Sequence, residues 1–210
     1  TIVSCLLVLQ YPVPENKSGQ QSVDLLQRLI EDLGATRTGT FCVDCETYQS
    51  TQTNPQRLVH VLHNTEQPAS CFAVLDTGTG LVADILYDHL MLKLKGFYTA
   101  RKNNRVECKG QRYVYGDFII KVGSVNIGQN MSFKGILVEL EYGPCVVPVD
   151  CWNLMKELLQ GFMGNHAENL SIYLKGKMEQ VYAPLDTMQQ YLEHFNNFRK
   201  VSSGTQPADR

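Results

Sequence analysis

Residues 105–142 read RVECKGQRYVYGDFIIKVGSVNIGQNMSFKGILVELEY, and three strand-like runs follow one another in this stretch. They cover 105–109, 112–125 and 133–142, with short connections between them. In the third run, Ile136, Val138 and Leu140 point one way and the residues between them point the other. Consecutive strands with short connections pair antiparallel, so this stretch predicts an antiparallel sheet.

The rest of the chain adds strands and helices in an order that favours an α+β fold. Runs with strand character lie at 1–11, 38–48, 57–63, 70–75 and 81–83, and runs with helical spacing at 18–33, 85–97, 151–163 and 185–199. Because the helices do not alternate one for one with the strands, the order argues against a doubly wound parallel sheet. We expect a mostly antiparallel β-barrel of about eight strands with about four flanking helices.

Local signals indicate where the helices begin and end. Ser18 or Ser22 is placed to cap the first helix and Asp150 the third, because these side chains accept hydrogen bonds from the free N–H groups of a first turn. Gly34 and Gly164 follow as C-caps. In the second helix, one apolar stripe is expected from Leu86, Leu90, Leu94 and Phe97.

Size and composition indicate a globular protein. The chain has 210 residues and a mass of 23.7 kDa; 43% of its residues are hydrophobic and 19% are charged. We expect one barrel domain over residues 1–200 and, because residues 201–210 carry almost no apolar surface, a disordered tail there. The net charge of −2 argues against nucleic-acid binding by the whole chain. No apolar run approaches the roughly 20 residues that cross a bilayer, so we expect no membrane partner.

One segment departs from this overall balance of charge. Between Lys93 and Lys121 the chain carries eight basic and two acidic residues. Such a segment predicts a basic face that can steer an acidic partner, although a solvated helix end and hairpin would give the same pattern. The candidate partner-binding residues are Arg101, Lys102, Arg105 and Arg112.

The seven cysteines indicate reduced thiols inside a cell, because their number is odd and a chain of this size can form an adequate core. Cys42, Cys45, His60 and His63 have a spacing close to that of a zinc finger. In strands, however, residues three apart point to opposite faces, so neither pair converges on one ion. We therefore expect no metal ion.

No catalytic motif in the sequence has all the residues that its reaction needs. Asp76-Thr77-Gly78 resembles the aspartic-protease motif, but that reaction needs two carboxylates that share a proton, and no second Asp-Thr-Gly or Asp-Ser-Gly is present. The motif also suits a turn between strands. The five histidines are scattered, so no base and nucleophile pair suggests itself. We expect no catalytic residue and no cofactor.

Blocks of sequence spread through most of the chain resemble one known family. The most specific block is VELEYGPCVV at 138–147, followed by DCW at 150–152. The others are FCVDCETY at 41–48, HN at 63–64 leading to CFA at 71–73, LKGF at 94–97, GDF at 116–118 with KVG at 121–123, and DTMQQY at 186–191. In this order they are similar to the family of Mediator complex subunit twenty, the TBP-related-factor-proximal family.

The resemblance implies a non-catalytic subunit of the Mediator head module, located in the nucleus and bridging regulators to the RNA polymerase II initiation machinery. It also implies the fold of Mediator subunit eighteen and of RNA-triphosphatase tunnels, a β-barrel with helices packed against it. Subunit eighteen would then be the heterodimer partner, and the C-terminal segment of subunit eight would hold the pair to the head.

The alternative is a metal-dependent phosphohydrolase of the triphosphate-tunnel type. Such a site needs several inward glutamates for the metal and basic residues for the phosphate. The candidates are Glu46, Glu139 and Glu141 for the metal, and Arg112 and Lys121 for the phosphate. Glu107 is the only acid on the strands just before Glu139, too few for such a site, so we interpret Glu139 and Glu141 as a solvated strand face.

Overall fold

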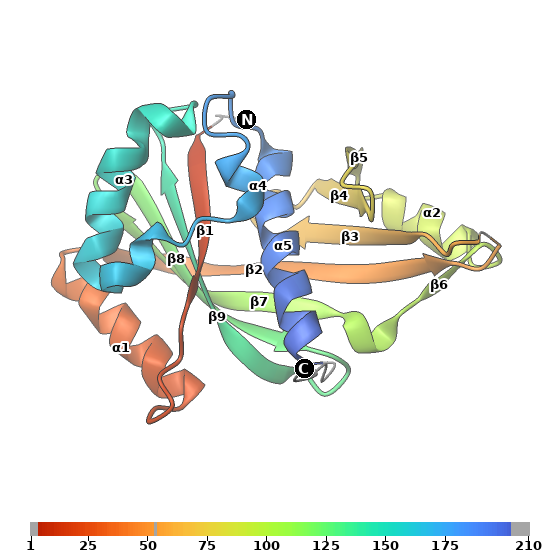
Figure 1. Ribbon diagram of the computed structural model, residues 1–210, viewed down its shortest axis with the longest axis horizontal. Helices are drawn as coiled ribbons and strands as arrows, with labels where there is room; N and C mark the ends of the chain where they lie inside the picture. The colour runs from red at the N-terminus through yellow and green to blue at the C-terminus, as the bar shows by residue number, and fades with distance from the viewer. Residues whose placement is uncertain (1–3, 53, 203–210) are drawn as a thin grey trace, which may run out of the picture.

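The computed structural model describes residues 4–52 and 54–202, and one antiparallel sheet dominates it (Figure 1). The strand order is β1-β9-β8-β7-β2-β3-β4-β5, with β6 paired to the end of β2. The described ranges hold nine strands: β1 (Cys5–Tyr11), β2 (Thr36–Ser50), β3 (Leu58–Asn64), β4 (Ser70–Leu75), β5 (Gly80–Asp84), β6 (Tyr98–Ala100), β7 (Val106–Tyr115), β8 (Phe118–Ile127) and β9 (Ser132–Tyr142). Every pair is antiparallel, which confirms the predicted α+β class.

Strands β7, β8 and β9 form a meander, but its first turn lies elsewhere than predicted. Tyr115 pairs with Phe118, so the turn consists of Gly116 and Asp117. Gly116 has a φ of +56°, which glycine adopts without a steric penalty. The predicted break at 110–111 lies inside β7, where the backbone of Gly110 continues the ladder opposite β8. A glycine in a strand pattern can mark close backbone approach rather than a turn.

The helices are α1 (Gly19–Asp32), α2 (Tyr87–Lys93), α3 (Pro148–Met163), α4 (Ile172–Lys175) and α5 (Pro184–Ser202), with 3₁₀ turns η1 (Lys102–Asn104) and η2 (Gly164–Glu168). Helices α1 and α3 cover the part of the sheet formed by β1, β8 and β9 (Figure 1). Within residues 4–52 and 54–202 no helix is long and apolar enough to cross a membrane.

Helix α5 explains why the sheet curls without closing. It contacts β1 and β9 near one edge of the sheet, and β4 and β5 at the other. Among the described residues β1 and β5 do not pair with each other, so the predicted barrel is an open one with a helix between its edges. The α5 side chains of Tyr191 and Phe195 are fully buried in the main core.

A second, smaller core lies under α2, where Met91 packs against β3 and β4. The prediction that residues 1–200 form one domain stays a prediction. Of the predicted tail, Val201 and Ser202 form the end of α5, and the remainder lies outside the described residues, as do positions 1–3 of the first predicted strand.

The helix signals were partly correct. Ser18 caps α1: its hydroxyl accepts from the Gln21 N–H, and the Gln21 side chain accepts from the Ser18 N–H. The Asp150 cap was wrong, because Pro148 occupies the first turn of α3 and places Asp150 inside the helix. Around α2, the stripe expected from helical spacing is largely exposed, and Met91 is the buried residue of that helix.

Candidate functional site

The predicted basic segment forms a short loop, residues 101–105, which we call the basic loop. Its position follows from the length of β2, whose first part pairs with β7 and whose last residues pair with β6. Between these two partners the chain leaves the sheet as η1. The loop is anchored at both ends, because the Arg101 N–H donates to the Thr47 carbonyl and the Arg105 carbonyl accepts from the Gly128 N–H.

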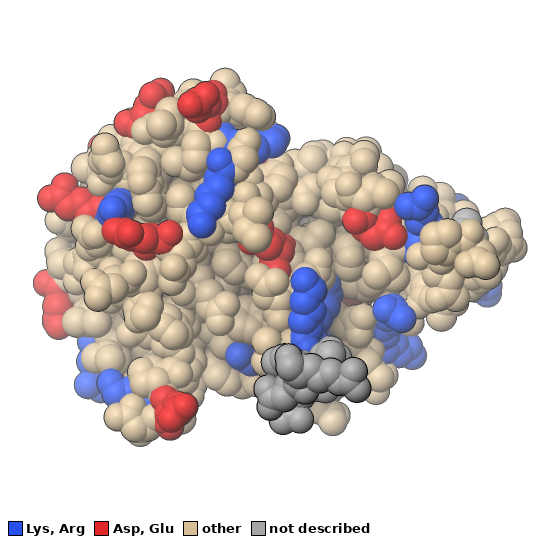
Figure 2. Space-filling model, in the orientation of Figure 1, with Lys and Arg blue, Asp and Glu red and all other residues tan. Residues whose placement is uncertain are grey.

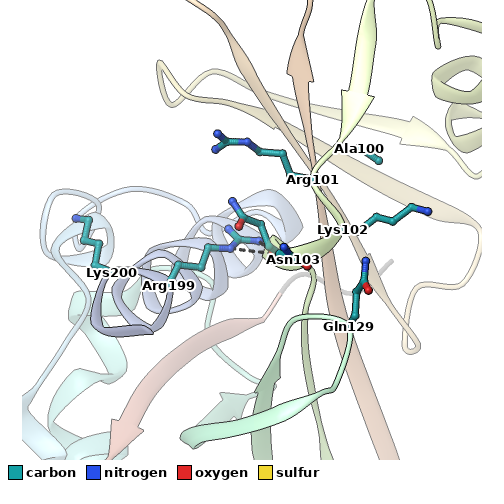
Figure 3. Close-up of a pocket in the computed structure, with 8 residues that line it drawn as sticks. Ala100, Arg101, Lys102, Asn103, Gln129, Arg199 and Lys200 are labelled. Atoms are coloured by element: carbon teal, nitrogen blue, oxygen red, sulfur yellow. Dashed lines mark hydrogen bonds between the residues drawn. The ribbon is translucent and has the colours of Figure 1, made fainter. Parts of the chain in front are cut away.

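Two further basic residues reach this loop from the end of α5. The Arg199 guanidinium donates to the Asn104 carbonyl at 2.7 and 3.0 Å, which fastens the helix to the loop (Figure 3). Together the two segments and Gln129 line an open depression of about 690 Å³. Sequence reasoning missed Arg199 and Lys200, because only tertiary packing brings α5 to residues so distant in the chain.

The four predicted partner-binding residues are not all in one place. Arg101, Lys102 and Arg105 are exposed on the basic loop, and an Arg105 nitrogen lies 3.7 Å from the Asp44 carboxylate. Arg112 lies further along β7. Its guanidinium donates to Glu66 at 2.9 Å and to the Thr38 hydroxyl at 2.8 Å, so it belongs to a different group of side chains.

Charge is unevenly distributed over the molecular surface. In Figure 2, Asp and Glu lie mainly over the helical half of the visible face, and Lys and Arg are prominent beside the C-terminal end of α5 and towards the narrow end of the sheet. A net-acidic chain therefore presents a local basic surface. Such a surface favours encounter with an acidic partner.

Of the two glutamates predicted to face solvent, Glu139 is in fact buried, in a cluster of charged side chains. Glu139 and Lys121 are each 1% exposed and lie opposite each other on β9 and β8. The Lys121 ammonium donates to Glu139 at 2.5 Å and also to Glu66, and the Tyr191 hydroxyl donates to the other oxygen of Glu139 at 2.6 Å. The solvated-face interpretation was therefore wrong for Glu139. Glu66, in the turn after β3, was missed because nothing in its local sequence indicates that its carboxylate reaches Lys121.

This arrangement determines what the cluster can do chemically. Burial disfavours the charged ammonium of Lys121, but the nearby carboxylates of Glu139 and Glu66 outweigh this and raise its pKa. Glu66, Glu139 and Glu141 have oxygens within 4.8 Å of one another, but the Lys121 ammonium is bound to two of these carboxylates. Glu46, the third predicted metal ligand, instead accepts from Tyr48 at 2.9 Å. The cluster is a charge-compensated bridge between strands.

The histidines and Cys45 of the zinc-finger-like spacing each bond to other residues. His60 bonds to the Thr47 hydroxyl at 3.0 Å, and His63 bonds to Asp44 and Asp88. Cys45 is fully buried, and its sulfur accepts from Arg199 at 3.3 Å. Asp76 lies in the turn between β4 and β5, where it accepts from the Leu58 N–H and lies 3.8 Å from Arg57, so its motif forms a turn.

A second surface feature, absent from the sequence predictions, is apolar. The segment from β5 through α2 to the following turn exposes a series of large hydrophobic side chains, and we call it the β5–α2 segment. They are Leu81, Val82, Ile85, Leu86, Leu90, Leu92 and Phe97, each between 46% and 67% exposed. β5 is also the last strand in the order of the sheet, so one of its edges has no strand partner within the described ranges. Exposed apolar surface next to a strand edge without a strand partner is typical of an interaction site.

Comparison with known proteins identifies the family of this chain. Residues 2–196 match the family described as "TATA-binding related factor (TRF) of subunit 20 of Mediator complex". The chain is 50% identical to Mediator of RNA polymerase II transcription subunit 20 of Anopheles gambiae, over 92% of this chain and 94% of that protein. It is 49% identical to the Homo sapiens protein of the same name, over 94% of each chain. Among solved structures, a chain of the Schizosaccharomyces pombe Mediator head module aligns with a TM-score of 0.43 and 10% identity, over 76% of this chain and 96% of that one. With a family match over nearly its whole length and relatives at about half identity, this chain belongs to the Mediator subunit 20 family.

Proposed function

We propose that this protein is a non-catalytic subunit of the head module of Mediator, which takes part in transcription regulation through protein–protein contacts. The observation that carries the proposal is the sequence identity of about 50% to relatives named as Mediator subunit 20. The similarity extends over more than nine-tenths of this chain and of those relatives. The proposal places the protein in the nucleus, where RNA polymerase II transcription takes place.

The proposed partners are Mediator subunit eighteen, as the heterodimer partner, and the C-terminal segment of subunit eight. The β5–α2 segment supports a direct contact with subunit eighteen, because an interface needs apolar anchors that are buried on association, and Leu86 and Leu92 are 65% and 67% exposed. We assign these two side chains as anchors.

The basic loop supplies the second part of the proposed interface. Arg101, Lys102 and Arg105 protrude from the sheet, where their charge acts on an approaching acidic surface before contact is made. Arg112, the fourth predicted residue, is not included in the tested surface, because its guanidinium is paired with Glu66 in a different group of side chains.

We do not propose the phosphohydrolase alternative. Phosphoryl transfer needs metal ions and phosphate ligands that are available to substrate. The two basic candidates for phosphate, Arg112 and Lys121, are both bound to Glu66, and Lys121 is also bound to Glu139.

The proposal is tested by coexpressing this chain with subunit eighteen and the subunit eight segment and measuring association rate and affinity. The triple variant Arg101→Glu, Lys102→Glu, Arg105→Glu should lower the association rate at least tenfold at low salt, because electrostatic steering acts mainly on that rate. Its matched control reverses Lys17, Arg28 and Arg37, three exposed basic residues around α1, and should associate like the parent chain.

The double variant Leu86→Glu, Leu92→Glu should instead raise the dissociation rate, since it removes buried anchors. Thermal unfolding of each free variant should stay close to that of the parent. Normal assembly by both variants would refute the assigned surface, and failure of the parent chain to join subunit eighteen at all would refute the partner.

A further inference from the structure

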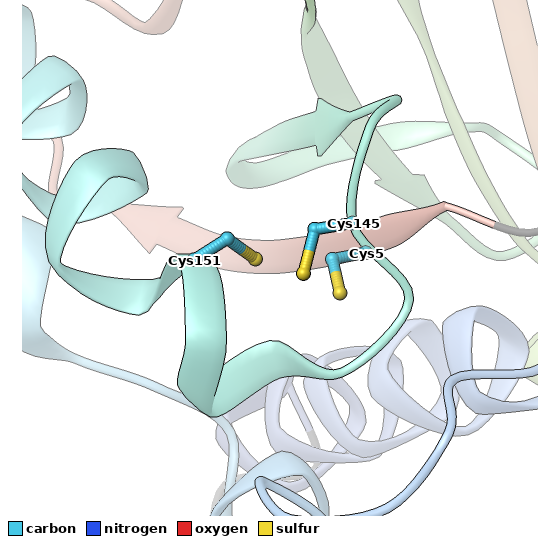
Figure 4. A group of neighbouring side chains, drawn as sticks. All are labelled: Cys5, Cys145 and Cys151. Atoms are coloured by element: carbon cyan, nitrogen blue, oxygen red, sulfur yellow. The ribbon is translucent and has the colours of Figure 1, made fainter.

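Three cysteines from separate parts of the chain meet at one end of β1 (Figure 4). Cys5 is the first residue of β1, Cys145 lies in the connection after β9, and Cys151 lies near the beginning of α3. Their Sγ atoms all lie within 4.8 Å of one another, and all three are free thiols. The backbone holds them together, because the Cys5 N–H donates to the Cys145 carbonyl at 2.8 Å.

The spacing of these sulfurs is close to that of a zinc thiolate site. Zn–S bonds of about 2.3 Å in tetrahedral geometry place sulfurs about 3.8 Å apart. The three sulfurs therefore need to approach one another by about 1 Å at most. Cys5 and Cys151 are buried, whereas Cys145 is half-buried. One side of the cluster is therefore open to solvent.

One feature of the fold, the N-terminus of α3, favours a thiolate at Cys151. Cys151 lies close to the N-terminus of α3, whose cap residue Val147 provides no side-chain hydrogen bond. The N-terminus of a long helix stabilises negative charge. The Met155 thioether, 3.6 Å from the Cys151 sulfur, adds a further soft atom beside the cluster.

We propose that Cys5, Cys145 and Cys151 bind one Zn²⁺ ion, with a water molecule as the fourth ligand on the exposed side of Cys145. As each Zn–S bond forms, the thiol proton passes to solvent, and no electron is transferred. The bound ion fastens the beginning of β1 and of α3 to the connection after β9. Its role is structural, and it is independent of the proposed partner surface.

The test uses the full chain, purified under reducing conditions, supplied with Zn²⁺ and dialysed against a weak chelator. Elemental analysis should find about one zinc ion per chain. Replacing zinc by Co²⁺ should give the thiolate-to-cobalt charge-transfer absorption of a sulfur-rich tetrahedral site. Zinc should also raise the melting temperature by several degrees, because an ion that binds only the native state stabilises it.

The discriminating variant is Cys145→Ser, chosen because Cys145 is partly exposed, so its replacement should leave the fold intact. It should lose the zinc, the cobalt absorption and the zinc-dependent thermal shift. Its matched control, Cys42→Ser, removes another half-buried cysteine, on β2, and should keep all three.

Two results would overturn the proposal. One is a folded, reduced parent chain that retains no zinc, or retains as much as Cys145→Ser does. The other is the loss in air of two titratable thiols that belong to these cysteines, in a protein that also takes up no zinc when reduced. That combination would identify the cluster as a disulfide pair.

Discussion

The ammonium of Lys121 lies 2.5 Å from the carboxylate of Glu139, across two adjacent strands and with both side chains 1% exposed. Two opposite charges removed from water in this way are tolerated because each compensates the other. The pair is further bonded to Glu66 and Tyr191, so it links β8 and β9 to α5 and to the turn after β3.

Replacing Lys121 by methionine should destabilise the protein by about 3–5 kcal/mol, because it leaves the Glu139 charge buried without an opposite charge. Chemical denaturation measures this loss. The double variant Lys121→Met, Glu139→Gln removes that charge and keeps an acceptor for Tyr191, so it should be more stable than the single variant. The control Lys134→Met changes an exposed lysine of β9 and should have little effect. A single variant as stable as this control would contradict the assigned role.

The second prediction concerns His63, whose two ring nitrogens both face carboxylates. Nδ1 lies 2.9 Å from Asp44 and Nε2 lies 3.0 Å from Asp88. The hydrogen bond with Asp44, followed by that with Cys71, raises the pKa of His63 from 6.5 to about 11. The folded state therefore holds this proton where the unfolded state has lost it. The stabilisation is complete below pH 6.5 and declines as the pH rises towards 11.

The free energy of unfolding, measured between pH 6 and pH 9, should therefore fall with rising pH more steeply in the parent than in His63→Gln. Arg105, near Asp44, keeps its charge throughout this range, so it does not produce the slope. His89→Gln alters an exposed histidine of α2 and serves as the control. Identical slopes for the parent and His63→Gln would show that His63 is not held protonated.

His60, three residues earlier on β3, should respond to pH in the opposite sense. It is 6% exposed and bonded to the Thr47 hydroxyl; burial, with a further contribution from the charge of Arg199, lowers its pKa to about 4. Between pH 6.5 and 4 the unfolded state binds the proton that the folded state rejects, so stability falls with decreasing pH. His60→Gln should flatten this acid limb in denaturation experiments, and His89→Gln should leave it unchanged. If the stability of His60→Gln falls between pH 6.5 and 4 as steeply as that of the parent, other groups cause the fall.

The fourth prediction concerns the close approach of β7 and β8 at Gly110. A Cβ atom there would lie 1.8 Å from the Val122 carbonyl oxygen, which belongs to the backbone and cannot rotate away. Gly110→Ala should therefore lower the free energy of unfolding by about 1–3 kcal/mol or more. Gly96→Ala, where a Cβ meets no atom within 4 Å, is the matched control. Equal melting temperatures for the two variants would mean that β7 and β8 can accommodate a Cβ atom at position 110 without a loss of stability.

Most of the secondary structure could be predicted from local pattern alone. The strand-like run at 38–48 lies within β2, and Ser18, one of the two candidate caps, is the residue that caps α1. The errors share one cause: a tertiary neighbour changes what the local pattern implies. Gly110 continues a strand because Val122 approaches it closely, and Leu86 and Leu90 are exposed because the small core beneath α2 is filled from the helix mainly by Met91, with Tyr87 and Leu94 packed against it.

The candidate sites divide in the same way. Sequence identified the basic residues 101, 102 and 105, because charge density along the chain is a local property. It missed Glu66, Arg199 and the meeting of Cys5 with Cys145 and Cys151, because each depends on contacts between distant segments.

The sequence by itself determined the α+β class, the antiparallel meander and the family, since periodicity, turn residues and identity are written along the chain. Only the tertiary structure decided that Glu139 is buried against Lys121, that the sheet stays open around α5, and that three thiols meet at the end of β1. The physical reason is that burial and charge compensation are properties of neighbours in space. The curl of the sheet brings together residues whose separation in sequence carries no signal of their contact.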